Sequence, residues 1–216
     1  MKLFIDTADL DQIREACGWG IVDGATTNPT LVSKTGREPG ELYVEICRIV
    51  PGPVSLECVG LAPDEIVAEA QRLAQIADNV VIKVPLFREG LLAVKRLSAL
   101  GIKTNVTAVC SPLQALLAAK CGATYVSPFV GRLDLTANVG MDMIRQIKTI
   151  YDNYGFETQI LVASARHALH VLESALAGAQ VCTIPFDVME QLYRHPMTDA
   201  IMEQFLNDWK KVPATA

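Results

Sequence analysis

The stretch NVVIKVPL, residues 79 to 86, decides the fold. An almost unbroken run of valine and isoleucine is typical of a parallel strand that other elements cover on both faces. Lys83 stands inside this run, although a protonated ammonium group is rarely buried without a partner. The run therefore predicts a buried parallel strand, and Lys83 needs a chemical explanation.

Similar short apolar stretches alternate with longer amphipathic stretches along the whole chain. The expected strands span residues 2–6, 21–27, 54–59, 79–84, 103–109, 124–130, 159–164 and 181–185. The expected helices span residues 8–17, 40–50, 63–77, 89–100, 112–121, 140–154, 166–177 and 186–193. Glycines at 101, 122, 155 and 178 stand where helices should end. Eight strand-helix units without a flexible linker predict an α/β protein with one (β/α)8 TIM barrel over residues 1–216.

Two features of the architecture have alternatives. A doubly wound open sheet is disfavoured because it needs a glycine-rich turn after the first strand, and the turn here reads DTADL. Beyond the eighth unit, residues 197–211 repeat apolar side chains at Ile201, Phe205 and Trp209, which predicts a C-terminal helix with one apolar stripe. This helix either packs on its own barrel or contacts a neighbouring subunit.

Composition and charge exclude several classes of protein. Half of the 216 residues are hydrophobic and the net charge is −5, with no long basic run, so neither nucleic acid nor an anionic membrane is an expected partner. Asp6 interrupts the N-terminus too early for a signal peptide, and no apolar run reaches the roughly 20 residues of a membrane span. The six cysteines show no metal-binding spacing and are expected to be small buried hydrophobes in a reducing compartment. We therefore expect a cytoplasmic protein.

Polar side chains gather at the carboxyl ends of the expected strands, where enzymes with this fold place their chemistry. Taken singly they have ordinary explanations, such as helix capping by Asp6 or turn formation by Asn28. Their accumulation at one end of a barrel instead predicts an active site. The residues are Asp6, Thr26, Thr27, Asn28, Glu57, Lys83, Asn105, Thr107, Ser127, Ser164 and Arg166.

Lys83 is the expected nucleophile of this site. Burial in a barrel disfavours the charged form of a lysine, and a neutral amine attacks a carbonyl to form a Schiff base. Glu57 on the adjacent strand could move protons through a water molecule, and Asp6 could take a proton from a substrate hydroxyl. These roles together predict cleavage of a carbon-carbon bond next to a carbonyl. The alternative is a structural ion pair between Lys83 and Glu57.

An anion site is expected on the rim beside the lysine. Arg132 follows the sixth strand and Arg166 follows the seventh, so both guanidinium groups could bind one phosphate together with Ser164. The late loops of this fold are a recurrent phosphate site. The histidines do not favour a metal-dependent aldolase, because His167 and His170 lie three apart on an expected helix and His195 lies in a turn. We expect no metal and no cofactor.

Several segments resemble one family in its order over nearly the whole chain. FIDTA, DGATTNPTL, VIKVP, KTNVTAV, YVSPFVGR, ILVASAR and HPMTD...FLNDW are similar to segments of the small, single-domain transaldolases, which are close relatives of fructose-6-phosphate aldolase. The resemblance implies phosphorylated sugar substrates, the pentose phosphate pathway and a homo-oligomer, a pentamer or a decamer, in which the C-terminal helix lies between subunits.

The resemblance also implies roles for individual residues. Lys83 would form the Schiff base, Asp6 would act on the C4 hydroxyl, and Glu57 with Thr107 would hold the catalytic water. The dihydroxyacetone unit would contact Asn28, Asn105 and Ser127, the phosphate would contact Arg132, Ser164 and Arg166, and Thr26, Thr27 and Phe129 would complete the substrate-binding set.

Two positions favour transfer over simple cleavage. Fructose-6-phosphate aldolases carry Gln and Tyr where this chain has Glu57 and Phe129, and that tyrosine helps to release free dihydroxyacetone. The chain departs from the pattern of many relatives at Leu135, where a second Asp is common, and at His167 and Ala168, where a Pro is common. The open alternatives are fructose-6-phosphate aldolase, a transaldolase for a ketose with another anionic group, and a phosphosugar-binding barrel without catalysis.

Overall fold

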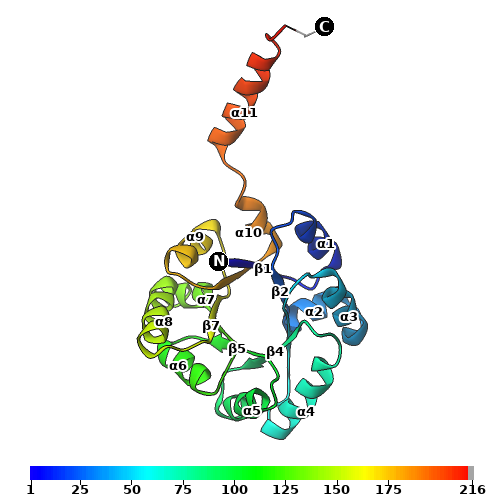
Figure 1. Cartoon of the computed structure of the whole chain (residues 1–216), viewed down its shortest axis with the longest axis vertical. Coiled ribbons are helices and arrows are strands. Elements are labelled where there is room, and N and C mark those ends of the chain that lie inside the picture. Colours follow the sequence, from blue (N-terminus) through cyan, green and yellow to red (C-terminus); the bar gives the residue numbers. More distant parts are fainter. Residues whose placement is uncertain (214–216) are drawn as a thin grey trace.

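The structure, a computed structural model, describes residues 1–213 and contains a closed barrel of eight parallel strands (Figure 1). Each strand pairs with its neighbours in sequence, and the last strand pairs with the first. The (β/α)8 barrel is therefore confirmed and the open sheet is wrong. The strands are β1 (Lys2–Asp6), β2 (Gly24–Thr26), β3 (Val54–Glu57), β4 (Val80–Pro85), β5 (Thr104–Val109), β6 (Tyr125–Pro128), β7 (Gln159–Val162) and β8 (Val181–Ile184).

The described part of the chain also contains eleven helices. None of the helices within residues 1–213 is both long and apolar enough to cross a lipid bilayer. The helices are α1 (Leu10–Gly18), α2 (Pro29–Thr35), α3 (Pro39–Ile49), α4 (Pro63–Ala74), α5 (Arg88–Ala99), α6 (Pro112–Lys120), α7 (Val130–Asp134), α8 (Gly140–Tyr154), α9 (Ala168–Leu176), α10 (Phe186–Gln191) and α11 (Pro196–Trp209).

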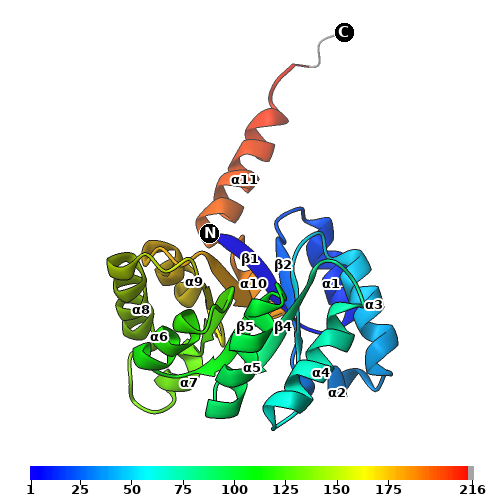
Figure 2. The same ribbon diagram turned by 60° about the horizontal axis from the view of Figure 1, so that its bottom comes forward.

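The short helices α2 and α7 are not expected from the sequence. Residue Asn28 caps α2 and Pro29 occupies its first turn, so a segment that reads as a turn continues as a helix. The expected strand 124–130 ends at Pro128, and its last residue begins α7 instead. Both helices lie at the end of the barrel opposite the N-terminus (Figure 2), which is the end where the strands finish.

Local signals explain most other boundaries. The side chain of Asp9 accepts hydrogen bonds from the backbone N–H groups of Asp11 and Gln12, so α1 begins two residues later than expected. Gly155 follows α8 with a φ of 62°, a left-handed conformation that glycine adopts without a steric penalty. The glycines that were expected to end helices therefore do so.

The barrel interior is divided into an apolar layer and a polar layer. Phe4, Val81, Tyr125, Leu161 and Val181 form one separate buried cluster contributed by five strands. Because side chains alternate along a strand, the residues two positions later point into the same lumen, nearer the carboxyl ends. The polar layer that holds the expected site therefore lies directly above a buried apolar layer in the lumen.

The cysteines are not uniformly buried. Cys47, Cys58 and Cys182 are buried, Cys17 and Cys121 are partly buried, and Cys110 is exposed after β5. The expectation that all six are buried is wrong for Cys110, which follows β5 instead of lying in it, and is met only in part by Cys17 and Cys121.

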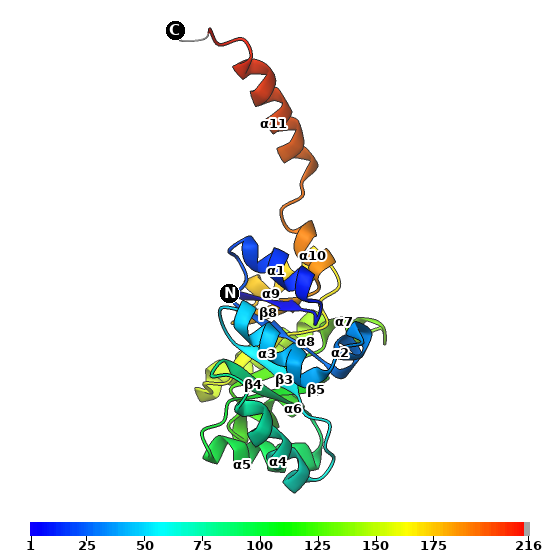
Figure 3. The ribbon, with the colours of Figure 1, turned by 90° about the vertical axis from the view of Figure 1, so that its right-hand side faces the viewer.

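Helix α11 extends away from the barrel instead of covering it (Figures 1 and 3). Within residues 1–213 none of its side chains is buried, and the side chains of Phe205 and Trp209 are 61% and 73% exposed. Packing of this helix on its own barrel, one of the two expectations, is therefore wrong.

Candidate active site

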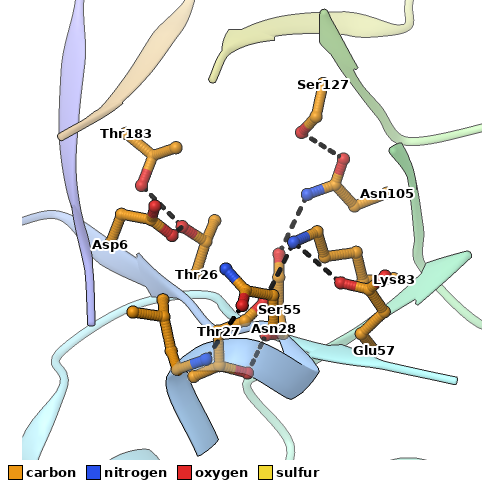
Figure 4. A network of polar contacts seen from close by, with 11 residues as sticks. Asp6, Thr26, Thr27, Asn28, Ser55, Glu57, Lys83, Asn105, Ser127 and Thr183 are labelled. Carbon is orange, nitrogen blue, oxygen red and sulfur yellow. Dashed lines mark hydrogen bonds and ion pairs between the residues drawn. The ribbon is translucent and has the colours of Figure 1, made fainter. Parts of the chain in front are cut away.

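Lys83 lies in the lumen near the carboxyl end of β4 and is 5% exposed. Its Nζ atom is 3.0 Å from Oε2 of Glu57 and donates a hydrogen bond of 2.9 Å to the carbonyl oxygen of Thr27 (Figure 4). The ion pair that was considered as a structural alternative is therefore present. The same contact also places a carboxylate where it can accept a proton from the ammonium group.

Asp6 faces Lys83 from the other side of the lumen (Figure 4). Thr26 donates its hydroxyl hydrogen to Oδ1 of Asp6 over 2.7 Å, and its oxygen is 2.6 Å from the hydroxyl of Thr183. Because Thr26 has only one hydroxyl hydrogen, Thr183 must donate to Thr26. Burial raises the pKa of Asp6, although the charges of Lys83 and Arg166 and the hydrogen bond from Thr26 act in the opposite direction.

A second buried chain of hydrogen bonds joins three strands. The amide Nδ2 of Asn105 donates to the hydroxyl of Ser55 over 3.1 Å, and the hydroxyl of Ser127 donates to Oδ1 of Asn105 over 2.7 Å. All three side chains are at most 1% exposed. The orientation of the Asn105 amide is thus determined by its neighbours.

Sequence reasoning missed Ser55 and Thr183. Each is a lumen residue on a strand whose alternation could have identified it, since Ser55 lies two positions before Glu57 and Thr183 two positions after Val181.

Thr107 differs from the other buried hydroxyls of the site. Its Oγ1 atom is buried and has no hydrogen-bond partner among residues 1–213. An unpaired buried hydroxyl is costly in a folded protein, so this atom is available to bond a substrate or a water molecule.

The residues after β2 have structural bonds of their own. Asn28 accepts the N–H of Leu31 through Oδ1 over 2.9 Å and thereby caps α2. The hydroxyl of Thr27 donates to the carbonyl oxygen of Ser55 over 2.9 Å. The side chain of Thr27 therefore bonds to the backbone of β3, whereas the backbone carbonyl of Thr27 accepts the hydrogen bond from Lys83.

The two arginines of the expected anion site lie on segments that contact each other directly. The N–H of Val130 donates to the carbonyl of Ala163 over 3.1 Å, and the N–H of Gly131 donates to the carbonyl of Ser164 over 3.2 Å. A Cβ atom on Gly131 would lie 2.3 Å from that carbonyl oxygen and 2.7 Å from Cγ of Arg166. Only glycine fits there, and the next residue is the exposed Arg132.

The other residues of this rim lie where the segments meet. Ser164 is partly buried and adopts a positive φ of 59°, an uncommon conformation for a residue with a side chain. Phe129 is partly buried and pairs with Ala163 in an isolated parallel bridge. The charge of Arg166 acts on Asp6, so this rim belongs to the same end of the barrel as the lysine.

The histidines lie at the N-terminal ends of two helices and not on barrel strands. His167 caps α9 instead of lying within it, His170 is buried in the first turn of α9, and His195 caps α11. Within residues 1–213 no three His, Cys, Asp or Glu side chains gather in an arrangement that could hold a metal ion.

Comparison with known proteins gives matches along nearly the whole chain. The model of the transaldolase/fructose-6-phosphate aldolase family matches residues 3–215. A probable transaldolase from Aquifex aeolicus is 59% identical over 213 residues, which are 99% of this chain and 98% of that protein. A probable transaldolase from Citrifermentans bemidjiense is 58% identical over 213 residues, which are 99% of this chain and 100% of that protein.

A comparison with solved structures supports the architecture alone. A mandelate oxidase mutant superimposes with a TM-score of 0.61 at 15% sequence identity, over 87% of this chain and 65% of that chain. At this level of identity the likeness concerns the barrel fold and not the chemistry.

Proposed function

The chain belongs to the transaldolase/fructose-6-phosphate aldolase family, and from this premise we propose that it is a Schiff-base transaldolase. In this proposal it moves a dihydroxyacetone unit from fructose 6-phosphate or sedoheptulose 7-phosphate to erythrose 4-phosphate or glyceraldehyde 3-phosphate. The reaction belongs to the pentose phosphate pathway in the cytoplasm. The observation that carries the proposal is the buried Lys83, 3.0 Å from Glu57 and facing Asp6.

The first steps use the pair on β3 and β4. Glu57 takes a proton from the ammonium group of Lys83, and the neutral amine attacks C2 of the ketose. The carbinolamine then loses water. In this proposal Glu57 and the hydroxyl of Thr107, which has no hydrogen-bond partner within residues 1–213, orient a water molecule that moves the protons. The resulting iminium ion is the electron sink for the next step, so the mechanism uses no metal.

Cleavage of the carbon-carbon bond uses Asp6. This carboxylate removes the proton of the C4 hydroxyl while the C3–C4 bond breaks, the electrons pass into the iminium group, and an aldose phosphate leaves. The raised pKa of Asp6 makes it a stronger base than an exposed aspartate, which supports this role. The enamine that remains on Lys83 attacks the carbonyl of the acceptor, and the steps run in reverse.

Substrate binding is assigned to the polar layer and the rim. The dihydroxyacetone unit is placed against Asn28, Asn105 and Ser127, and the phosphate against Arg132, Ser164 and Arg166. Thr26 donates a hydrogen bond to Asp6, the backbone carbonyl of Thr27 accepts one from Nζ of Lys83, and Phe129 at the rim has no acidic hydroxyl. A phenylalanine at this position cannot protonate the enamine, which favours transfer over the release of free dihydroxyacetone.

We also propose that the protein is a homo-oligomer, a pentamer or a decamer, in which α11 packs on a neighbouring subunit. The exposed apolar side chains of this helix support the proposal, since an isolated chain would leave them in water.

The experiment that tests the reaction is mass spectrometry of the intact protein after incubation with fructose 6-phosphate and borohydride, followed by peptide mapping. We expect one dihydroxyacetone-sized adduct on Lys83, and none on the folded variant Lys83→Met. Lys103→Met is the matched control, because Lys103 is exposed and should leave the adduct unchanged.

Three results would change the assignment. Thermal stabilisation by fructose 6-phosphate without any adduct would indicate a binding barrel. Free dihydroxyacetone that accumulates without an acceptor would indicate an aldolase. An adduct that forms only with a ketose bearing another acidic group would retain the chemistry and change the substrate.

A further inference from the structure

His170 occupies a position that the proposed mechanism does not use. It lies in the first turn of α9 and is 6% exposed, and its ring stacks on His167 with centroids 3.8 Å apart. In a buried imidazole, both ring nitrogens need hydrogen-bond partners.

Both partners belong to the segments that carry the rim arginines. The backbone N–H of Arg166 donates to Nδ1 of His170 over 3.1 Å. The Nε2 atom is 2.9 Å from Oδ2 of Asp134, the last residue of α7, and α7 also carries Arg132. Oδ1 of Asp134 accepts the N–H of Gly140 over 2.8 Å, so this carboxylate is itself held in place.

These bonds require one protonation state of the ring. Because Nδ1 accepts a hydrogen bond, it carries no hydrogen, and the single ring hydrogen lies on Nε2 and is donated to Asp134. In the imidazolium form, Nδ1–H would face the N–H of Arg166, and that bond would be lost.

We propose that His170 is a positioning residue for the phosphate-binding rim, because its neutral ring fastens the backbone at Arg166 to the end of the helix that carries Arg132. At the start of α7, the N–H groups of Val130 and Gly131 bond to the carbonyls of the residues after β7. At the end of α7, His170 connects Asp134 to the backbone of Arg166. This inference rests on the proposed function, which assigns phosphate to that rim.

The surroundings of His170 oppose its protonation. Burial lowers the pKa of His170, and the neighbouring His167 lowers it further, whereas Asp134 from α7 and Glu173 from α9 raise it. The charge of Glu173 is shared with Arg145 of α8, at 3.0 Å. The ring is therefore neutral at neutral pH and gains a proton only in acid.

Three variants and a control test the proposal. His170→Phe keeps an aromatic ring but removes both bonds, and His170→Asn retains an acceptor for the N–H of Arg166 but is too short to reach Asp134. Asp134→Ala removes the carboxylate that contacts Nε2 of His170. Because Asp134 is exposed, this variant replaces His170→Phe in the test if His170→Phe does not fold. His195→Asn is the control, because Asn also caps helices and His195 lies at α11.

The first readout is the affinity for inorganic phosphate by calorimetry, which needs no turnover and is therefore independent of the Schiff base. We expect His170→Phe to weaken phosphate binding about tenfold, His170→Asn to weaken it less, and His195→Asn to leave it unchanged. Unchanged affinity in a folded His170→Phe variant would overturn the proposal.

The second readout separates positioning from general support of the fold. For His170→Phe we expect the KM for fructose 6-phosphate to rise about tenfold while kcat changes less than about twofold, and the kinetics with unphosphorylated fructose to stay the same. An equal loss with both sugars would indicate a merely structural role and refute the assignment.

A pH series completes the test. As the pH falls below the usual histidine range, phosphate affinity should fall more steeply in the wild type than in His170→Phe, which lacks the ring whose protonation would break the bond to Arg166. Parallel curves would refute a requirement for the neutral ring.

Discussion

Substituting Gly131 by alanine should separate the two halves of the proposed phosphate site. The new Cβ atom would lie 2.3 Å from the carbonyl oxygen of Ser164, whereas real contacts of this kind are essentially never shorter than 3.0 Å. The segments must therefore move apart by roughly 0.7 Å, which also lengthens the 3.2 Å hydrogen bond from Gly131 to Ser164. The Cγ atom of Arg166, 2.7 Å from the new methyl group, must move as well.

Overpacking of this kind costs about 1–3 kcal/mol in the free energy of unfolding. In a chain of this length each kcal/mol lowers Tm by roughly 2–4 °C, which differential scanning calorimetry resolves. Because the displaced segments carry both arginines, the KM for phosphorylated sugars should also rise, while the borohydride-trapped adduct still forms on Lys83.

Gly18→Ala is the matched control for this prediction. Gly18 ends α1, and a Cβ atom added there would meet no atom within 4 Å beyond its own helix, so alanine should be neutral or stabilise the helix by up to about 1 kcal/mol. If Gly131→Ala retained both the Tm and the KM of the wild type, the close contact between α7 and the residues after β7 would not determine the geometry of the rim.

Three further predictions concern Asp6, Thr26 and α11. Because burial raises the pKa of Asp6, the folded protein binds the proton of this carboxyl group more tightly than the unfolded chain does, and ionised Asp6 destabilises the fold above its folded pKa. Asp6→Asn should therefore raise Tm at pH 7 and abolish turnover. An unchanged or lower Tm would contradict this reasoning. Thr26→Val removes a hydrogen bond that lowers the pKa of Asp6, so the acid limb of the kcat/KM profile should move to higher pH, and a limb that stays in place would show that another group controls it. Phe205→Asp places a charge on the exposed apolar side of α11 and should dissociate the proposed oligomer in analytical ultracentrifugation, whereas an unchanged sedimentation coefficient would place the interface elsewhere.

The local sequence determined the barrel and the identity of most residues in its polar layer. Continuous apolar runs such as the one around Lys83 specify buried parallel strands, and alternation assigns their side chains to the lumen or to the helices. Because all eight strands point the same way, their carboxyl ends necessarily meet at one end of the barrel. The position of Lys83 beside Glu57 follows from the pairing of neighbouring strands, which the chain order alone specifies.

Only the tertiary structure decided which polar groups bond to one another and where the last helix lies. Thr183 meets Thr26 because the barrel closes, which joins residues 157 positions apart in the sequence. His170 reaches Asp134 because the start of α7 is hydrogen-bonded to the residues after β7, a contact that no local periodicity encodes. The apolar stripe of α11 is visible in the sequence, but such a stripe indicates only that the helix needs a partner surface. The chain's own barrel is not that surface, because the chain leaves α10 in a direction that carries α11 away from the barrel (Figure 3). This direction is a property of the folded molecule.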